Sequence, residues 1–278
     1  MRNIRIVADS SADTLSLDTV PFASAPLRII AGDREFVDDE TLDTTEMTGW
    51  FDTYKGKSKT SCPNTGDWLD AFADAEEIFC VTITSGLSGS YNAACVAAQI
   101  YEADHPGRRV CVIDSLSAGP EMTLMVEKLA QLIQSGLSFE EIRDAVAAYS
   151  SKTGLLFMLE SLKNFANNGR VSPAVAKIAG LLGIRIVGKA SDEGTLEPLD
   201  KCRGEEKSLM AILQRLGKAG LHEGRVLIHH CMNSSAAERL ASMIREKFPK
   251  VRLRIGVCRG LCSYYAEKGG LLVGFEKV

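Results

Sequence analysis

The fold is indicated most clearly by Ile78-Phe-Cys-Val-Thr-Ile-Thr-Ser-Gly-Leu-Ser-Gly-Ser-Tyr-Asn-Ala-Ala-Cys-Val-Ala-Ala-Gln99. A short apolar and β-branched run, residues 78–83, ends in a cluster of serine, threonine and glycine, and an alanine-rich segment of helical composition follows over residues 92–101. This order predicts a buried strand, a tight polar turn and a helix, which together form one half of a βαβ unit.

The turn between that strand and helix has the composition of an anion-binding site. Glycine lets a ligand approach the backbone closely, and the start of a helix offers unpaired N–H groups and a partial positive charge. Such a turn suits an anion. The alternative is that Ser88 or Ser90 only caps the helix, which is the commonest role of a serine at that place. The hydroxyls and glycines of the turn are Thr84, Ser85, Gly86, Ser88, Gly89 and Ser90.

The composition is ordinary for a soluble globular protein, with 278 residues of which 45% are apolar and 24% are charged. A chain of this length is expected to bury a substantial core and to form two domains. The net charge of −4 argues against nucleic acid as the main partner. No apolar run approaches the roughly 20 residues that cross a membrane. Because the N-terminus also runs directly into a strand pattern, without signal-peptide architecture, we expect a cytoplasmic protein with no integral membrane segment.

The eight cysteines indicate neither a disulfide framework nor a metal site. No pair has the two-residue spacing typical of zinc and redox motifs, and Cys258 and Cys262, with three residues between them, come nearest. Cys80, Cys95 and Cys111 lie in apolar patterns, where free cysteine behaves as a small buried hydrophobe. We therefore expect no metal and no cofactor.

The first half of the chain alternates strand and helix patterns. Such repeats predict a parallel sheet covered on both faces, with ligands beyond the carboxyl ends of its strands. Three hydroxyl-rich turns, residues 9–11, 84–90 and 114–117, are expected to meet there. The expected strands are 4–8, 20–30, 78–83 and 109–114, the expected helices are 43–54, 67–75, 92–101, 121–135 and 139–150, and residues 59–66 are expected to form a turn.

The second half has more adjacent strand patterns and a hairpin signal at Asp192-Glu193-Gly194. These features favour a mixed or antiparallel sheet. The predicted fold class is therefore α/β, with an N-terminal α/β domain over residues 1–150, whose sheet is mostly parallel, and a C-terminal α+β domain over residues 151–278. The expected strands are 153–158, 184–189, 196–202, 225–229, 252–257 and 271–275, and the expected helices are 159–165, 174–182, 205–217 and 234–248.

Most signatures of catalysis are absent from the sequence. No glycine-rich loop has the pattern of a phosphate-binding or dinucleotide-binding motif. The run Gly86-Leu-Ser-Gly-Ser90 is close to the nucleophile elbow of serine hydrolases, but it ends in serine where glycine is expected. A hydrolase would also need a histidine base near Ser88. His229 and His230, at the end of a predicted strand, are the candidates, and the alternative is a structural role for both. A serine-dependent esterase or phosphoesterase that uses Ser88 stays open as the second hypothesis.

Two arginines stand in predicted turns and are candidates for binding an anion. Arg170 follows Asn-Asn-Gly and opens a helix pattern, and Arg203 follows the predicted hairpin. Arginine suits bidentate recognition of phosphate or carboxylate. The alternative is that both are solvated surface arginines.

Six segments, in order and spread over almost the full length, carry a family resemblance. They are Ile6-Val-Ala-Asp-Ser-Ser-Ala-Asp13, Thr60-Ser-Cys-Pro63, Ile83-Thr-Ser-Gly-Leu-Ser-Gly-Ser-Tyr-Asn-Ala-Ala94, Val112-Ile-Asp-Ser115, Leu159-Glu-Ser-Leu-Lys-Asn-Phe-Ala-Asn-Asn-Gly-Arg-Val-Ser172 and Lys201-Cys-Arg203. On this set the chain resembles the DegV family of bacterial fatty-acid-binding proteins, which are similar to the acyl-carrying subunits of bacterial fatty acid kinase.

The resemblance implies a non-catalytic protein with two domains and a long-chain fatty acid in an apolar tunnel between them. It implies that the carboxylate is held by hydroxyls of the Thr60-Ser61 turn and by Ser88, with the backbone of Gly89 nearby. It also implies that the protein presents the carboxylate to the catalytic subunit of a fatty acid kinase, and it places Arg170 and Arg203 at that contact.

The sequence departs from the family pattern near the C-terminus. The family has a Gly-Thr-His-Thr-Gly-Pro-Gly segment, and residues 261–270 stand in its place. We expect Tyr264 to replace the histidine that helps to bind the carboxylate. A phenol donates one hydrogen bond but carries no positive charge near neutral pH.

Overall fold

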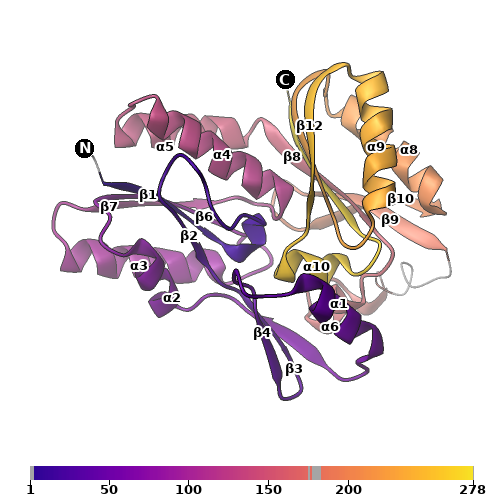
Figure 1. Ribbon diagram of the computed structural model, residues 1–278, viewed down its shortest axis with the longest axis horizontal. Helices are drawn as coiled ribbons and strands as arrows, with labels where there is room; N and C mark the ends of the chain where they lie inside the picture. The colour runs from indigo at the N-terminus through magenta and orange to yellow at the C-terminus, as the bar shows by residue number, and fades with distance from the viewer. Residues whose placement is uncertain (1–2, 175, 177–182, 278) are drawn as a thin grey trace.

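A computed structural model describes residues 3–174, 176 and 183–277 (Figure 1). Its first sheet has four strands, all parallel, in the order β2 (Phe22–Ala25), β1 (Ile4–Asp9), β6 (Glu77–Thr82) and β7 (Arg109–Asp114). The two central strands, β1 and β6, are almost continuously apolar because both of their faces are buried.

Helices cover the two faces of this first sheet, as Figure 1 shows. On one face α4 (Pro120–Gln134) and α5 (Phe139–Ser150) share a core with Ile6 and Phe79. On the other face α2 (Thr65–Phe72) and α3 (Ser90–Asp104) pack against Val7, Ile78 and Cys80. The alternation of these residues along β1 and β6 sends neighbouring side chains to opposite faces.

The second sheet has six strands in the order β10 (Leu196–Arg203), β9 (Ile184–Ala190), β8 (Thr153–Leu159), β13 (Leu271–Glu276), β11 (Glu223–His230) and β12 (Lys250–Val257). Only β11 and β12 pair in parallel; the other neighbours are antiparallel. On one face Leu156 and Met158 pack against α8 (Glu205–Lys218) and α9 (Ser234–Lys247). Leu155, Phe157 and Leu159 therefore lie on the opposite face, which is turned toward the rest of the molecule.

A third, small sheet is antiparallel and has the order β4 (Arg34–Val37), β3 (Arg28–Ala31) and β5 (Ser58–Ser61). Next to it lie α1 (Thr44–Thr53), α6 (Lys163–Asn167) and α10 (Gly260–Ala266). A short 3-10 turn, η1 (Ser10–Ala12), follows β1. Within the part of the chain that the structure describes, no helix combines the length and the apolar character that a membrane crossing needs.

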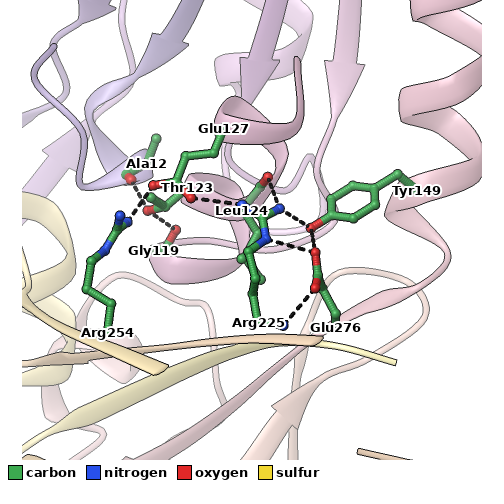
Figure 2. Close-up of polar contacts among 9 residues, drawn as sticks. All are labelled: Ala12, Gly119, Thr123, Leu124, Glu127, Tyr149, Arg225, Arg254 and Glu276. Atoms are coloured by element: carbon green, nitrogen blue, oxygen red, sulfur yellow. Dashed lines mark hydrogen bonds and ion pairs between the residues drawn. The ribbon is translucent and has the colours of Figure 1, made fainter. Parts of the chain in front are cut away.

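Two of the polar contacts between the first sheet's layer and the second sheet lie at the two ends of β11. Figure 2 shows Arg225 of β11 reaching toward Tyr149 and the backbone of Leu124, between the carboxylates of Glu127 and Glu276. The Arg225 guanidinium lies 3.0 Å from Glu127 and 2.9 Å from Glu276, and its Nη2 donates to the Tyr149 hydroxyl at 2.7 Å.

The second contact is a buried pair at the other end of β11. Asp13 Oδ2 lies 2.8 Å from His229 Nδ1, and Asp13 Oδ1 accepts the N–H of Arg259 at 2.7 Å. The Asp13 side chain is fully buried and that of His229 is 6% exposed. The two sheets are therefore held together by polar contacts at both ends of this strand.

The predicted fold class is confirmed: the first sheet is parallel and covered on both faces, and the second is mixed. Some elements differ from the prediction. Residues 20–30 form two strands of different sheets, β2 and β3, separated at Pro26. The expected turn over residues 59–66 begins with β5, and α10 has no predicted counterpart.

Strand β8 continues to Leu159, so the helix expected over residues 159–165 is wrong in its start, and α6 begins at Lys163. The helix expected over residues 174–182 lies mostly outside the described residues. All strands of the first and small sheets precede residue 150, and all strands of the second sheet follow it. The division into domains 1–150 and 151–278 stays a prediction.

Candidate functional site

The buried carboxylate of Asp9 organises the carboxyl edge of the first sheet. Asp9 Oδ2 accepts the N–H of Ile83 at 2.8 Å and the hydroxyl of Ser90 at 2.6 Å, while Oδ1 accepts the hydroxyl and N–H of Ser11. Burial raises the pKa of Asp9, and these four hydrogen bonds oppose the rise. Asp9 thus connects the end of β1 to the end of β6 and to the start of α3.

The third hydroxyl-rich turn joins the other two at this edge. The N–H of Thr84 donates to the carbonyl of Ser117 at 2.9 Å, and the N–H of Ser85 donates to Asp114 Oδ1 at 3.1 Å. The N–H of Gly119 donates to the carbonyl of Ser11 at 2.7 Å. The convergence predicted for residues 9–11, 84–90 and 114–117 is therefore confirmed.

A cavity of about 420 Å³ lies between these turns and the second sheet. This volume is within the range of small-molecule sites, roughly 300–1,000 Å³. Most of its wall is apolar and comes from several elements, with the face of β8 opposite the turns of the first sheet. The apolar side chains of the wall are Leu27, Ile30, Ile83, Leu87, Ala118, Leu155, Phe157, Leu159, Phe165, Ala190, Leu196, Leu261, Ala266 and Leu272.

The polar part of the wall brings β5 and the start of α3 together. Thr60, Ser61, Ser88 and Gly89, which the family resemblance implies as the carboxylate-binding residues, line the cavity. A Cβ atom on Gly89 would lie 3.4 Å from the sulfur of Cys62, so the turn after β5 directly contacts the helix N-terminus. The N-cap residue of α3, Gly89, supplies no capping side chain. The N-terminal end of α3 therefore has the positive potential that an anion requires.

Ser88 partly fulfils both roles considered from the sequence. Its Oγ accepts the N–H of Ser90 at 3.3 Å, which is a long capping interaction at the first turn of α3. Accepting this bond leaves the hydroxyl proton of Ser88 available to a carboxylate in the cavity. The Ser88 hydroxyl can therefore cap α3 as an acceptor and bind a ligand as a donor at the same time.

Thr60 is held by two side chains from the C-terminal half of the chain. Its Oγ1 lies 2.8 Å from the hydroxyl of Tyr265, and its N–H donates to Asn168 Oδ1 at 3.2 Å. Tyr265 lines the cavity. Burial raises the pKa of Tyr265, although the Thr60 hydrogen bond opposes the rise, so the phenol is a neutral donor near pH 7.

Tyr264 takes a different place from the one that the sequence predicts. Its side chain does not line this cavity; it packs with Ile29, Phe36 and Met47. Its hydroxyl lies 2.7 Å from Ser58 Oγ and accepts from Asn168 Nδ2 at 3.0 Å. Successive residues of a helix point about 100° apart. The phenol at the cavity, expected from Tyr264, is supplied by its neighbour Tyr265.

Helix α10, which carries both tyrosines, is fixed at its start by a distant carboxylate. Asp38 Oδ1 accepts the N–H of Gly260 at 2.9 Å, and Oδ2 accepts the N–H of Leu261 at 2.8 Å. Burial raises the pKa of Asp38 to about 6. The position of Tyr265 thus depends on a residue that lies more than 200 positions away in the sequence.

The two arginines predicted to contact a partner lie in different environments. Arg170 is half-buried and lines the cavity; its Nε donates to the carbonyl of Leu87 at 3.1 Å and its Nη1 to the carbonyl of Asn168 at 2.9 Å. Arg203 is exposed at the end of β10 and does not line the cavity. The structure therefore does not bring Arg203 into the site.

The wall beside the Ser88 turn is closed by the hairpin between β9 and β10. Thr84 Oγ1 donates to the carbonyl of Gly194 at 2.8 Å. A Cβ atom on Gly86 would lie 2.7 Å from the carbonyl oxygen of Glu193, so glycine at that position is required by a close approach of two backbones. Part of the Ser-Gly-Leu-Ser-Gly motif is therefore explained by packing, since Gly86 lets the hairpin between β9 and β10 approach the turn.

Neither of the histidines considered as the base of a serine hydrolase lies in the cavity with Ser88. His229 is paired with Asp13, and His230 Nδ1 accepts the N–H of Asn233 at 3.3 Å. None of the four histidines lines the cavity. Among residues 3–174, 176 and 183–277, no group of three or more histidine, cysteine or acidic side chains is arranged to hold a metal ion.

Several functional candidates have no clear signal in the sequence. Tyr265 and Asn168 reach Thr60 only through tertiary contacts. Lys59 and Lys189 also line the cavity, and with Arg170 they give it three cationic side chains. Lys189 lies 3.2 Å from Glu197, so its charge is partly compensated.

A comparison of the whole chain with protein families agrees with this geometry. The family model for uncharacterised proteins of the DegV family matches residues 3–277. The chain belongs to the DegV family. The family resemblance seen in the sequence is thereby confirmed over nearly the full length of this DegV chain.

Close relatives of the DegV chain are known from sequence and from solved structures. The DegV domain-containing protein spr0652 of Streptococcus pneumoniae is 48% identical over 276 residues, which is 98% of both chains. The fatty acid kinase B3 protein of Streptococcus pneumoniae, solved with linoleic acid, is 47% identical, with a TM-score of 0.97 over 100% of both chains. A DegV family protein from Eubacterium eligens, solved with heptadecanoic acid, is 44% identical, with a TM-score of 0.97 over 99% of this chain and 100% of that one.

Proposed function

We propose that this protein binds a long-chain fatty acid, with the acyl chain in the apolar cavity and the carboxylate at its polar end. The observation that carries the proposal is the division of one cavity wall into a large apolar part and a small polar part. The polar part combines hydroxyl donors with a helix N-terminus, which is the environment that a carboxylate needs. The fatty acids in the two similar solved structures support the same ligand class.

The carboxylate is held by neutral donors, with the cationic side chains contributing at longer range. Thr60 and Ser88 are the principal hydroxyls, Tyr265 supplies the phenol, and Ser61 and the backbone of Gly89 lie in the same polar part of the wall. Each hydrogen bond to a charged group contributes about 1.5–3 kcal/mol. Burial of the acyl chain contributes about 0.8 kcal/mol for each methylene. The acyl chain therefore provides most of the binding affinity, and the carboxylate fixes the orientation of the fatty acid.

The proposal is tested by extracting the purified protein with organic solvent under denaturing conditions and identifying the released lipid by mass spectrometry. We expect one long-chain fatty acid for each protein chain. Delipidated protein should bind fatty acid again, more weakly as Thr60→Ala or Ser88→Ala than as the matched control Ser85→Ala, because Ser85 does not line the cavity. Delipidated, folded protein that binds no fatty acid would refute the function.

We further propose that the protein acts as a carrier, rather than as an enzyme, and presents the bound carboxylate to a fatty acid kinase. The relative named fatty acid kinase B3 protein supports this role. Arg203 is the better candidate for the partner contact, because it is exposed and does not line the cavity. Arg170 holds the carbonyls of Leu87 and Asn168, so its replacement is also expected to disturb the cavity.

The carrier role is tested with delipidated protein, a fatty acid kinase and ATP. Arg203→Glu should retain fatty-acid binding and lose phosphorylation of the bound fatty acid. Arg239→Glu, at an exposed arginine on α9, serves as the control for the change of charge. Phosphorylation that is equal in both variants would exclude Arg203 from the contact.

A further inference from the structure

The floor of the apolar cavity contains an aromatic ring that lies over a glycine. Phe157 of β8 and Gly188 of β9 are directly opposite each other in the antiparallel pair. Phe157 is 4% exposed and lines the cavity, and Gly188 is buried. A Cβ atom on Gly188 would lie 2.6 Å from Cε2 of the Phe157 ring. The ring therefore occupies the space in which a side chain at position 188 would stand.

The backbone of Gly188 does not itself require glycine. Its φ is not in the left-handed region, and it lies inside a regular strand. A glycine within a strand is less favourable than alanine, since it loses more conformational freedom on folding. The feature that requires glycine here is the close approach of the Phe157 ring and of the carbonyl oxygen of Glu197, which is also 2.6 Å from the same Cβ position.

We infer that Gly188 determines which acyl chains the cavity accepts, by allowing the ring of Phe157 to lie against β9. The inference rests on the proposed fatty-acid binding. A larger residue at position 188 pushes the ring away from the strand. Beneath the ring lies the sheet itself, and on its other side lies the cavity, so the ring moves into the space of the ligand. Phe157 is thus a specificity residue, and Gly188 is the residue that positions it.

The chain contains a matched pair that is not part of the cavity. Gly154 of β8 is opposite Phe275 of β13, and a Cβ atom on Gly154 would lie 2.8 Å from Cζ of that ring. Phe275 faces the core formed with α8 and α9, on the other side of the second sheet. Gly154→Ala therefore crowds an aromatic ring on the facing strand, as Gly188→Ala does, without changing the cavity; it lacks the additional contact with a backbone carbonyl.

The test compares the affinities of delipidated wild type, Gly188→Ala and Gly154→Ala for stearic and linoleic acid, and for a series of shorter saturated fatty acids. Each methylene that loses its contact should weaken binding about fourfold, or about 0.8 kcal/mol. We expect Gly188→Ala to lower the affinity for fatty acids long enough to pass the ring by about tenfold or more. The affinity for the shortest fatty acids should stay within about threefold of the wild-type value. Gly154→Ala should keep the wild-type order of affinities.

A second pair of variants covers the case in which Gly188→Ala does not fold. Phe157→Leu removes the ring and enlarges the cavity, and Phe275→Leu is its control on the other face. We expect the ratio of linoleic to stearic acid affinity to change by about fourfold or more in Phe157→Leu alone. A wild-type ratio in Phe157→Leu, or an equal loss for every chain length in Gly188→Ala, would overturn the inference. If the wild type itself binds no fatty acid, the proposed function fails instead.

Discussion

Replacing Arg225 by methionine is expected to loosen the contact between the two large sheets. The Arg225 side chain is 13% exposed and is shared by the carboxylates of Glu127 and Glu276, which are 23% and 16% exposed. Methionine keeps much of the volume and removes the charge. Two partly buried carboxylates and the Tyr149 hydroxyl then lose their shared donor.

The magnitude follows from the burial of the cluster. Breaking a buried ion pair on one side costs about 3–5 kcal/mol, while an exposed pair contributes about 0–1 kcal/mol. Because all three side chains retain some contact with water, we expect a loss at the lower end, about 3 kcal/mol. Arg239 on α9 provides the control, since it is 46% exposed and also pairs with two carboxylates, Glu205 and Glu206. Arg239→Met should cost less than about 1 kcal/mol.

The dependence on pH provides an independent check of the same prediction. Burial favours a higher pKa for Glu276, but hydrogen bonds from Tyr149 and Arg225 outweigh it and hold the pKa below its ordinary value of 4.5. A carboxylate with a lowered pKa stabilises the native state at pH values above its ordinary pKa, and that stabilisation is lost as the pH falls through the folded-state pKa. The difference between wild type and Arg225→Met should therefore shrink as the pH falls below 4.5.

The free energy of unfolding is measured by urea titration of the wild type, Arg225→Met and Arg239→Met at pH 7 and at several lower pH values. The reasoning is refuted if Arg225→Met costs no more than Arg239→Met. It is also refuted if the cost of Arg225→Met stays constant as the pH falls through the acidic range.

Three further predictions concern the cavity and the elements that position its wall. Tyr265→Phe should weaken fatty-acid binding by about 1.5–3 kcal/mol in a titration of delipidated protein, whereas Tyr264→Phe should change affinity less and stability more; the reverse order would return the ligand role to Tyr264. Burial raises the pKa of Asp38 from 3.8 to about 6, so between these pH values the native state binds a proton that the unfolded state does not, and the free energy of unfolding falls as the pH rises. In urea titrations Asp38→Asn should remove this dependence of the unfolding free energy on pH. A dependence that persists in the variant would have to come from another group. Gly86→Ala should destabilise the protein by about 1–3 kcal/mol, since its methyl group meets the Glu193 carbonyl, and thermal unfolding equal to wild type would show that the hairpin moves freely.

The first sheet could be predicted because its signals are local. In β6 an apolar run is followed at once by a polar turn and a helix, and the same order recurs after β7. Asp9 could be placed at the ligand edge for the same reason, because it ends an apolar strand. Its role as a buried connector could not, since two of its partners, Ile83 and Ser90, are more than 70 residues away.

The elements that the sequence did not indicate depend on distant partners. Strand β5 has the polar sequence Ser-Lys-Thr-Ser and becomes a strand by pairing with β3. Helix α10 begins where the carboxylate of Asp38 accepts two of its first N–H groups. The choice between Tyr264 and Tyr265 depends on the rotation of that helix, which no local pattern specifies.

The position of β5 at the edge of the small sheet has a consequence for how occupancy can be observed. This strand pairs only with β3 and carries Thr60 and Ser61. Edge segments with few backbone partners open locally at a lower free energy than the whole protein, and their amides exchange with solvent through that opening. A ligand that contacts only the closed strand adds RT ln(1 + [L]/Kd) to the opening free energy. Hydrogen exchange at residues 58–61 should therefore slow in proportion to ligand occupancy, while exchange in the core of the first sheet still follows global unfolding. A short edge strand thereby becomes a natural reporter of whether a carrier is loaded or empty, without any label on the lipid.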